Sequence, residues 1–544
     1  MYTQGSFFRV LVITLVLCLS FVVITSQPSD AALTEDLGTS LTAMSLGNAV
    51  TADPPGIYAI HFNPAGLTDL KRTHAQVSMI SPSFNFEQTY TAPKNYNVFG
   101  FSDDPVKNRT SNTSRINIHL PYIGRMSGPQ GLPAPAGGGV SYRPPGTNLT
   151  FANAFYVQAA GGFDRNQSRD PGRYGGREAG ITNITYFSPS VGYEVTDNFS
   201  IGGSVGFDYV SLSAKTDFRA PNPIVGLVRT IDEDICPALA GAGSIGLWFF
   251  GSACVGGGIG PFESAGTLEM TVTDNVVPHY NLGMTWEPTD WLGFGVTYRS
   301  ESEAQLSGSY VIDYSKEFER LINTLNRGPI FRAIFAALRL PGRGHDRQSG
   351  RVNLDVTFPQ HVKVGTKINP LPTTAPGLQF NVDWGWTDWD EWDEFVVNFD
   401  GPNDLLQFGR LLTGQGIDQL NLPRGYKSKA YWGAGMKLDF WDLYQLRMGF
   451  EDRESSIPKD KLGPFAAIPD AKLYGFGVGY KWSRQLTLDF NLTHLRAEAF
   501  VPANTSSNLN QTGVNNLIYN PYAGLDVNLK TTATIAGMTA NYRF

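Results

Sequence analysis

Apolar and polar residues alternate along many short stretches of this chain. In one of them Leu486, Leu488, Phe490 and Leu492 alternate with Thr487, Asp489, Asn491 and Thr493, and residues 292–299, 378–387 and 474–482 show the same pattern. Successive side chains of a β-strand point to opposite faces, so each stretch predicts a strand with one apolar and one polar face. Aromatic residues stand near the ends of these stretches, which is typical of strands that cross a membrane as a β-barrel.

The final stretch, residues 534–544, has this pattern too. An outer-membrane β-barrel closes on its last strand, with lipid outside and a polar lumen inside. We therefore expect a closing strand here, in which Phe544 serves closure and membrane insertion and contacts no ligand. One face would carry Ala536, Met538, Ala540, Tyr542 and Phe544, and the other Gly537, Thr539, Asn541 and Arg543.

The same reading along the whole chain predicts an even number of strands, as bacterial barrels require. Fourteen are expected, starting near residues 74, 116, 151, 181, 199, 266, 291, 350, 377, 428, 444, 470, 485 and 530. Tight connections at 194–198, 287–290, 441–442 and 482–485 predict periplasmic turns. Long connections at about 87–115, 221–265, 315–349, 400–427 and 500–529 predict extracellular loops.

The N-terminal region predicts export. Arg9 precedes an apolar run from Val10 to Ile24, and small and polar residues follow up to Ala32. This order is typical of a cleavable secretory signal, which we place at residues 1–31. The alternative is an N-terminal membrane anchor, but a run of about 15 residues is short of the ~20 that span a bilayer. Export and the aromatic strand ends also favour a barrel over a soluble β-sandwich.

Composition narrows the class further. After the signal no apolar run is long enough for a transmembrane helix, whereas a mean hydropathy of -0.17 fits a barrel, because alternating strands dilute the apolar signal. The 59 glycines and 12% aromatic residues fit a sheet with aromatic girdles and tight turns. A net charge of -7 argues against a nucleic-acid partner.

Cys236 and Cys254 follow the signal, and in an exported protein they form a candidate disulfide. The alternative is that they are two free, partly buried thiols.

Two of the long loops are unusually apolar. Residues 235–262 are rich in large apolar side chains, and residues 316–340 read as two amphipathic helices broken at Gly328-Pro329. These faces either pack on each other as a loop lid or form a landing surface for an apolar ligand, since exposed apolar patches usually bind something. The candidate landing residues are Leu247, Trp248, Phe249, Phe250, Phe331, Ile334, Phe335 and Leu338.

Residues 33–70 fit neither a strand nor a flexible tail. They are rich in Gly, Ala and small polar residues, and they precede the first predicted strand. The economical place for about 40 such residues is inside the barrel. We therefore expect a plug over residues 32–72 and a barrel over residues 73–544.

Two motifs of this plug carry a family resemblance. Residues 46–53 (LGNAVTAD) and then Asn63, Pro64, Ala65 and Gly66 resemble the hatch signature of the FadL/TodX family of outer-membrane transporters of hydrophobic compounds. Residues 294–301, 308–310, 356–359, 451–453 and 468–470 are also similar to segments of that family. The resemblance covers the exported chain from end to end.

The resemblance implies a fourteen-stranded antiparallel β-barrel with an N-terminal hatch in its lumen, and passive uptake of long-chain fatty acids or related hydrophobic compounds. Ligand would be captured by the loops, transferred past the hatch and released sideways at a kink of the third strand. Residues 33–45 would sense the ligand, and Gly161 and Gly162 would ease the kink. Partners would be a long-chain fatty acid or hydrocarbon ligand and the lipid and lipopolysaccharide of the outer membrane. The protein would be a monomer.

The long loops depart from the family pattern, which leaves the substrate open between fatty acids, alkanes and aromatic hydrocarbons. No carboxylate-binding residue can be placed from the sequence. Arg320, Arg327, Arg332 and Arg339 are candidates near the landing surface. The alternative is that they are exposed charges on the wet faces of helices.

Nothing in the sequence favours catalysis. Residues 202–206 match G-x-S-x-G, but that motif needs a strand-to-helix turn, and here it lies inside an alternating strand. The seven histidines are scattered without zinc spacing, and the acidic stretch 388–394 reads as a solvated rim in preference to a Ca²⁺ site. We expect no enzyme, cofactor or metal. An outer-membrane lipase-type enzyme or a structural or adhesin barrel is the alternative function.

Overall fold

The computed structural model describes most of the exported chain. The described residues are 36–98, 100–113, 115–165, 167–219, 236–237, 262–326, 332–333, 336–337, 339–372, 375, 377–413, 416–464, 469–512 and 520–544. The predicted signal, residues 1–31, lies outside them. None of the described helices is long and apolar enough to cross a membrane.

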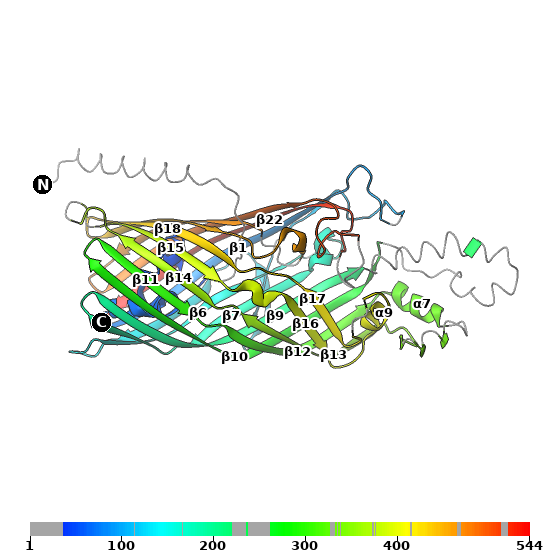
Figure 1. Ribbon diagram of the computed structural model, residues 1–544, viewed down its shortest axis with the longest axis horizontal. Helices are drawn as coiled ribbons and strands as arrows, with labels where there is room; N and C mark the ends of the chain where they lie inside the picture. The colour runs from blue at the N-terminus through cyan, green and yellow to red at the C-terminus, as the bar shows by residue number, and fades with distance from the viewer. Residues whose placement is uncertain are drawn as a thin grey trace.

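The described strands form a closed antiparallel barrel with fourteen strands in its wall (Figure 1). The barrel closes where β22 pairs with β1, from His74 opposite Arg543 to Thr91 opposite Asp526. The expected fold class and the closing role of the final strand are therefore confirmed. In wall order the strands are β1 (Thr73–Thr91), β5 (Ala134–Tyr142), β6 (Leu149–Asp164), β7 (Glu178–Phe187) with β8 (Ser190–Thr196), β9 (Phe199–Arg219), β10 (Ser264–Thr289), β11 (Leu292–Arg299) with β12 (Ser302–Tyr314), β13 (Arg347–Phe358) with β14 (His361–Ile368), β15 (Leu378–Thr387) with β16 (Glu394–Phe399), β17 (Gln419–Pro423) with β18 (Lys429–Phe440), β19 (Tyr444–Arg453), β20 (Ala471–Lys481), β21 (Leu486–Val501) and β22 (Asp526–Arg543).

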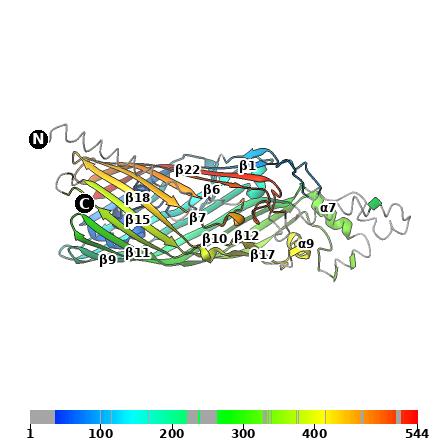
Figure 2. The ribbon, with the colours of Figure 1, turned by 45° about the horizontal axis from the view of Figure 1, so that its top comes forward.

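The two ends of the barrel differ. The C-terminus and the short turns lie at one end, and helices α7 (Lys316–Leu325) and α9 (Asp404–Thr413) lie at the other, among the long loops (Figures 1 and 2). We refer to these ends as periplasmic and extracellular. The loops also contain the short helices η3 (Pro171–Gly175), η5 (Trp389–Trp392) and η6 (Lys459–Lys461).

One predicted wall strand lies elsewhere. The strand expected near residue 116 exists as β3 (Arg115–Leu120), but it pairs with β4 (Gly124–Pro129) in a hairpin that packs on the outer face of the wall. The second wall strand is β5, which pairs with β1 and β6. Its sequence, APAGGGVSY, contains too few apolar residues to show alternation. A short strand, β2 (Arg109–Ser111), adds to the extracellular end of β1.

The polarity of both faces reverses part of the way along the wall strands. In β21, Phe490 and Leu492 face outward and are each 49% exposed, and Asn491 faces the lumen. Beyond Thr493 the next outward residues, His494, Arg496 and Glu498, are polar or charged, and the lumen-facing residues become apolar, including Leu495 at 2% exposure. β10 reverses in the same way at a bulge between Asp274 and Val277. The barrel therefore has a membrane-embedded half with a polar lumen and a half beyond the membrane with an apolar lumen.

The segment before β1 fills the membrane-embedded half. It contains α2 (Leu41–Met44), η1 (Gly56–Tyr58), α3 (Ala59–Phe62) and η2 (Pro64–Asp69), and nearly all its side chains are buried. We call the described part of this segment, residues 36–70, the hatch. Ser40 caps α2 and Asn63 caps η2, each accepting a hydrogen bond from a backbone N–H at the start of its helix.

Candidate functional site: hatch, lumen and wall seam

The hatch backbone lies directly against glycines of the barrel wall. A Cβ atom on Gly475 would lie 2.1 Å from the carbonyl oxygen of Met44, and one on Gly295 would lie 2.1 Å from that of Thr51. Any larger residue at these positions would push the hatch away from the wall. Wall glycines with such contacts to hatch backbone are Gly202, Gly295, Gly433, Gly435, Gly449 and Gly475.

The hatch motif joins two parts of the hatch to the wall. The Asn63 side-chain amide donates to the carbonyl oxygens of Thr51 at 2.8 Å and of Met284 on β10 at 3.0 Å. Gly283 provides the room, because a Cβ there would lie 2.0 Å from Asn63 Oδ1. Pro64 lies against Gly202, and Gly66 packs so closely on Pro54 that a Cβ would lie 2.2 Å from its ring. Ala65 is fully buried.

A buried ion cluster holds the start of the hatch. Asp36 is 1% exposed, and its carboxylate pairs with the Lys363 ammonium and with Arg453, at 3.3 Å from Nη2. Burial alone would raise the pKa of Asp36, but Lys363, His61 and Arg453 outweigh it and hold the pKa well below its usual range. Asp36 is therefore ionised and binds the hatch to β14 and β19.

His61 links this cluster to the opposite wall. Burial lowers the pKa of His61 to about 4, so the ring is neutral near pH 7. Its Nε2 then donates to Asp36 at 2.9 Å, and its Nδ1 accepts from Arg299 Nη1 at 3.3 Å. Arg299 also donates to Gln158 on β6, and Gln158 donates to Asp208 at 2.8 Å. One continuous polar network thus runs from β19 across the hatch to β6.

Above the hatch the lumen is apolar. One cluster of buried side chains extends over β9, β10, β12, β13, β16 and the helices α7 and α9, and it includes Ile312, Ile322 and Val352 at 0% exposure. Smaller clusters line β1 and β20–β22 directly above the hatch. Leu37 of the hatch and Phe84 of β1 each pack against both of these smaller clusters.

The wall is interrupted beside Phe84. β5 pairs with β1 only as far as Ile80 and with β6 only as far as Tyr156. In the described part of the chain, no strand joins β1 to β6 between these positions and the extracellular end, and we call this interruption the wall seam. Phe84 and Phe86 of β1 and Gly161 and Phe163 of β6 face each other across it: the Phe86 and Phe163 rings are 5.3 Å apart, and a Cβ on Gly161 would lie 4.0 Å from the Phe84 ring.

Side chains and one irregular segment cover the seam on the β1 side. The Gln130 amide bonds both the N–H and the carbonyl oxygen of Phe84, and Thr113 Oγ1 accepts from Phe86 N at 2.8 Å. Gly131 N donates to Pro82 O at 2.9 Å. These contacts satisfy hydrogen-bonding groups at the edge of β1 without a strand, so no sheet ladder joins β1 to β6 here.

The two glycines expected to kink the third strand lie in the regular part of β6. Gly161 pairs with Ile181 and Gly162 with Gly180, and the irregularity of β6 is a bulge between Val157 and Ala159, at Gln158. Gly161 borders the seam. Gly162 lies under the β3–β4 hairpin, and a Cβ there would lie 2.2 Å from the carbonyl oxygen of Asn117.

The predicted landing residues, Leu247, Trp248, Phe249, Phe250, Phe331, Ile334, Phe335 and Leu338, all lie outside the described residues. So do Arg327 and Cys254, while Cys236 takes part in a disulfide. The helix expected at 316–325 is α7, whose Phe318 and Ile322 pack into the apolar cluster of the lumen, as a lid would. Arg320, Arg332 and Arg339 are exposed.

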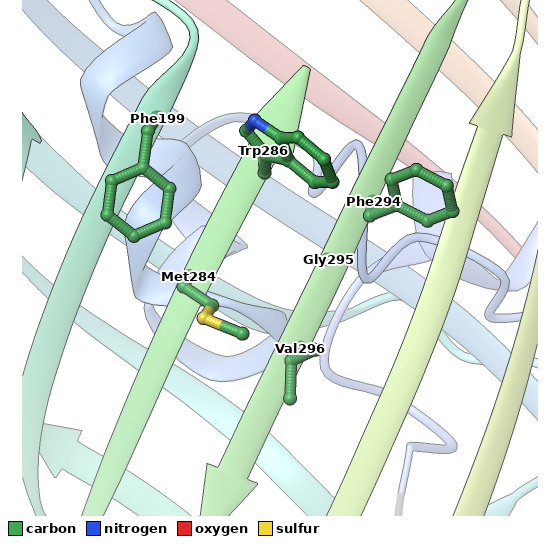
Figure 3. Close-up of a pocket in the computed structure, with 6 residues that line it drawn as sticks. All are labelled: Phe199, Met284, Trp286, Phe294, Gly295 and Val296. Atoms are coloured by element: carbon green, nitrogen blue, oxygen red, sulfur yellow. The ribbon is translucent and has the colours of Figure 1, made fainter. Parts of the chain in front are cut away.

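A groove of about 320 Å³ lies on the outer face of β9, β10 and β11 (Figure 3). Phe199, Met284, Trp286 and Phe294 stand around it, and Trp286 and Phe294 stack at 5.8 Å. These side chains face the lipid, so the groove is separate from the lumen. Among the described residues, no group of three or more His, Cys, Asp or Glu is placed to hold a metal ion.

Sequence reasoning missed the apolar half of the lumen and the ion cluster. The first left a readable signal, because the apolar positions of β21 change from even to odd numbers after Leu492. The second left none, since Asp36, Lys363 and Arg453 are far apart in the chain and carry no local pattern.

A closed barrel that is filled by a hatch and lined with apolar side chains defines an outer-membrane transport protein for hydrophobic compounds. The family model described as outer membrane protein transport protein (OMPP1/FadL/TodX) matches residues 21–544, so the chain belongs to this family. It is an outer-membrane transporter and not an enzyme.

Solved structures show the same fold. A FadL homologue of Pseudomonas aeruginosa is 15% identical, with 95% of this chain and 100% of that chain covered and a TM-score of 0.63. The toluene transporter TodX of Pseudomonas putida is 12% identical, with 94% and 100% covered and a TM-score of 0.57. The toluene transporter TbuX of Ralstonia pickettii is 16% identical, with 93% and 98% covered and a TM-score of 0.55. No curated protein sequence matches this chain.

Proposed function

We propose that this protein is a passive uptake channel for long-chain fatty acids or related hydrophobic compounds, which are captured by loops, passed on under control of the hatch and released sideways. The observation that carries the proposal is the apolar lumen beyond the membrane. A channel for hydrophilic solutes needs a polar, water-filled lumen. Here Leu495, Val352 and Ile312 line the same face that carries Asn and Asp lower in the barrel.

Capture would take place at the extracellular end. Each buried methylene contributes ~0.8 kcal/mol, so an acyl chain can leave the polar lipopolysaccharide layer for an apolar surface without an energy source. The loops at 221–265 and 315–349 are the proposed landing surface. α7 supports this, because its packed face already continues the apolar lining of the lumen.

Transfer would depend on the start of the hatch. Leu37 lies at the floor of the apolar lumen, one residue from the Asp36 ion cluster. A ligand that packs on Leu37 would therefore favour a position of the hatch start other than the one that the ion pairs of Asp36 impose. A ligand that binds better when the hatch is in one position than in another shifts the equilibrium toward the hatch position that it prefers.

Release would occur through the wall seam. Phe84 joins the apolar clusters above the hatch to the seam, and beyond it lie Phe86 and Phe163. The path would be apolar on the lumen side of the seam, and Gln130 and Thr113 would move aside on its outer side. The hatch would close the direct path to the periplasm. Diffusion down a gradient into the outer membrane would follow.

A structural or adhesin barrel is the remaining alternative, and it gives no reason for an apolar lumen. A fluorescent long-chain fatty acid, added to the purified protein in detergent, tests the proposal. We expect saturable binding, with the ligand recovered chemically unchanged. Deletion of residues 33–45 should leave a folded barrel with impaired uptake. Absence of acyl-ligand binding to the folded protein would contradict the proposal.

A further inference from the structure

The β3–β4 hairpin lies outside the barrel and descends along its outer face toward the membrane. At its start Arg115 pairs with Asp164 at the extracellular end of β6. Further along, Asn117 lies over Gly162 and Gly180, and His119 contacts Tyr209 through Nδ1 at 2.8 Å. The turn that follows, Pro121–Ile123, comes near Tyr186, which is 44% exposed at the top of the lipid-facing band.

The hairpin presents its polar face to the barrel. Arg125 pairs with Glu178 and lies 3.6 Å from Glu269, and Ser127 donates to Asp164 at 2.8 Å. The wall beneath is polar or lacks side chains, with Gly162, Gly180, Thr182, Ser211 and Ser213 in the contact.

Its other face and its tip are apolar. Ile118 and Met126 are opposite each other in the hairpin and point away from the wall, since their neighbours His119 and Arg125 point toward it. Tyr122 is fully exposed at 106%, and Ile123 is 68% exposed. Tyr122 also has a φ of 62°, a left-handed conformation that glycine or asparagine adopts with less strain. An aromatic side chain kept fully exposed in such a conformation points to a contact outside the protein.

We propose that the tip of the β3–β4 hairpin inserts into the outer leaflet of the outer membrane, where Tyr122 and Ile123 contact lipid acyl chains beside the wall seam. Polar residues toward the wall and apolar residues outward are the pattern of the lipid-facing strands themselves. Tyrosine is a preferred residue at the membrane interface. The tip comes near the lipid-facing band at Tyr186, and Phe187 and Val276 are further exposed apolar residues of that band. Thr113 and Gln130, which cover the seam, flank the hairpin directly, so the lipid contact would hold the seam at leaflet depth.

The proposal is independent of the transported substrate and can be tested on the full-length protein in bilayers. An environment-sensitive fluorophore is attached to Ile123→Cys, and quenching by phospholipids with brominated acyl chains is measured. Leu282→Cys, 53% exposed in the lipid-facing band, is the lipid reference, and Asn112→Cys, exposed just before the hairpin, is the water reference. Labelling of the chain without an added cysteine gives the background.

We expect quenching at Ile123→Cys close to that of Leu282→Cys and several-fold above that of Asn112→Cys. Met126→Cys, further from the tip on the same face, should fall between the two references, and it checks the result if the first variant misfolds. Quenching at both hairpin positions no greater than at Asn112→Cys would overturn the proposal. So would self-quenching between protein molecules without quenching by lipid, which would assign the tip to a second copy of this chain.

Discussion

Residues of the same type lie in opposite surroundings in this barrel. Gly161 borders the seam, whereas Gly162 is covered by the hairpin. Asp36 is buried in an ion cluster, whereas Asp390 forms an exposed pair with Lys427 in which the side chains are 50% and 59% exposed. Each pair offers a test residue and its own control.

The two glycines should respond differently to the same substitution. Gly162→Ala places a methyl group 2.2 Å from the carbonyl oxygens of Asn117 and Ala179, and we expect a loss of stability of about 1–3 kcal/mol. Gly161→Ala should be nearly neutral, because only the Phe84 ring comes within 4.0 Å. Denaturant unfolding in detergent measures both, and equal stabilities would contradict the packing of the hairpin on the wall.

Asp36→Asn should loosen the hatch. The substitution leaves Lys363 buried without its carboxylate partner and leaves Arg453 with Glu451 alone. Breaking a buried pair on one side costs roughly 3 kcal/mol or more. We expect more frequent or larger openings in single-channel conductance, and faster amide hydrogen exchange in the hatch. Asp390→Asn is the matched control, since an exposed pair contributes about 1 kcal/mol or less. Unchanged conductance and exchange in Asp36→Asn would show that the cluster does not hold the hatch.

At the scale of elements, the strands were largely predictable and their environment was not. Alternation located β21 and β22, because one face of each strand is buried in lipid. The short turns were then located as the gaps between alternating stretches. β5 escaped prediction because its glycines lie against the hatch and carry no pattern, and β3 was predicted as a wall strand because a hairpin that lies on a barrel alternates as the wall does. The hatch motif Asn63-Pro64 was recognisable from sequence. Its docking on wall glycines was not, since that contact joins residues more than 100 positions apart.

The phase reversal within β21 predicts opposite effects of adjacent substitutions. Leu495 faces the apolar lumen, and His494 faces outward. Leu495→Asn places an amide without partners in the ligand path, at a cost of about 2 kcal/mol, so we expect fatty-acid uptake to fall roughly tenfold or more. His494→Asn should leave uptake unchanged. If both variants take up ligand at the rate of the original protein, the apolar lumen is not the path.

The hatch segment has its own test at this scale. Removal of residues 33–45 deletes α2 and the Asp36 cluster but no wall strand. The barrel should still show the heat-dependent electrophoretic shift of a folded outer-membrane protein, while uptake is impaired. Uptake at the original rate would rule out the hatch as a switch.

For the whole molecule, the arrangement separates two problems of hydrophobic transport. The half beyond the membrane has a polar outside and an apolar inside, so in the proposed route it would carry an apolar solute through the polar surface layer. The membrane-embedded half has an apolar outside and a polar, hatch-filled inside, so in the proposed route it would close the way to the periplasm and leave the seam as the exit. The family resemblance indicated this class of transporter from sequence, but the proposed path depends on long-range contacts that no local pattern encodes.

The most direct test of the central claim is uptake of a radiolabelled long-chain fatty acid by cells that lack their own transporter of this family. We predict that the protein restores saturable uptake, and that Gly161→Trp, which fills the seam, abolishes it while the variant still binds the fatty acid after purification. Uptake no greater than in cells without the protein would contradict transport. Full uptake by a folded Gly161→Trp variant would contradict lateral release through the seam.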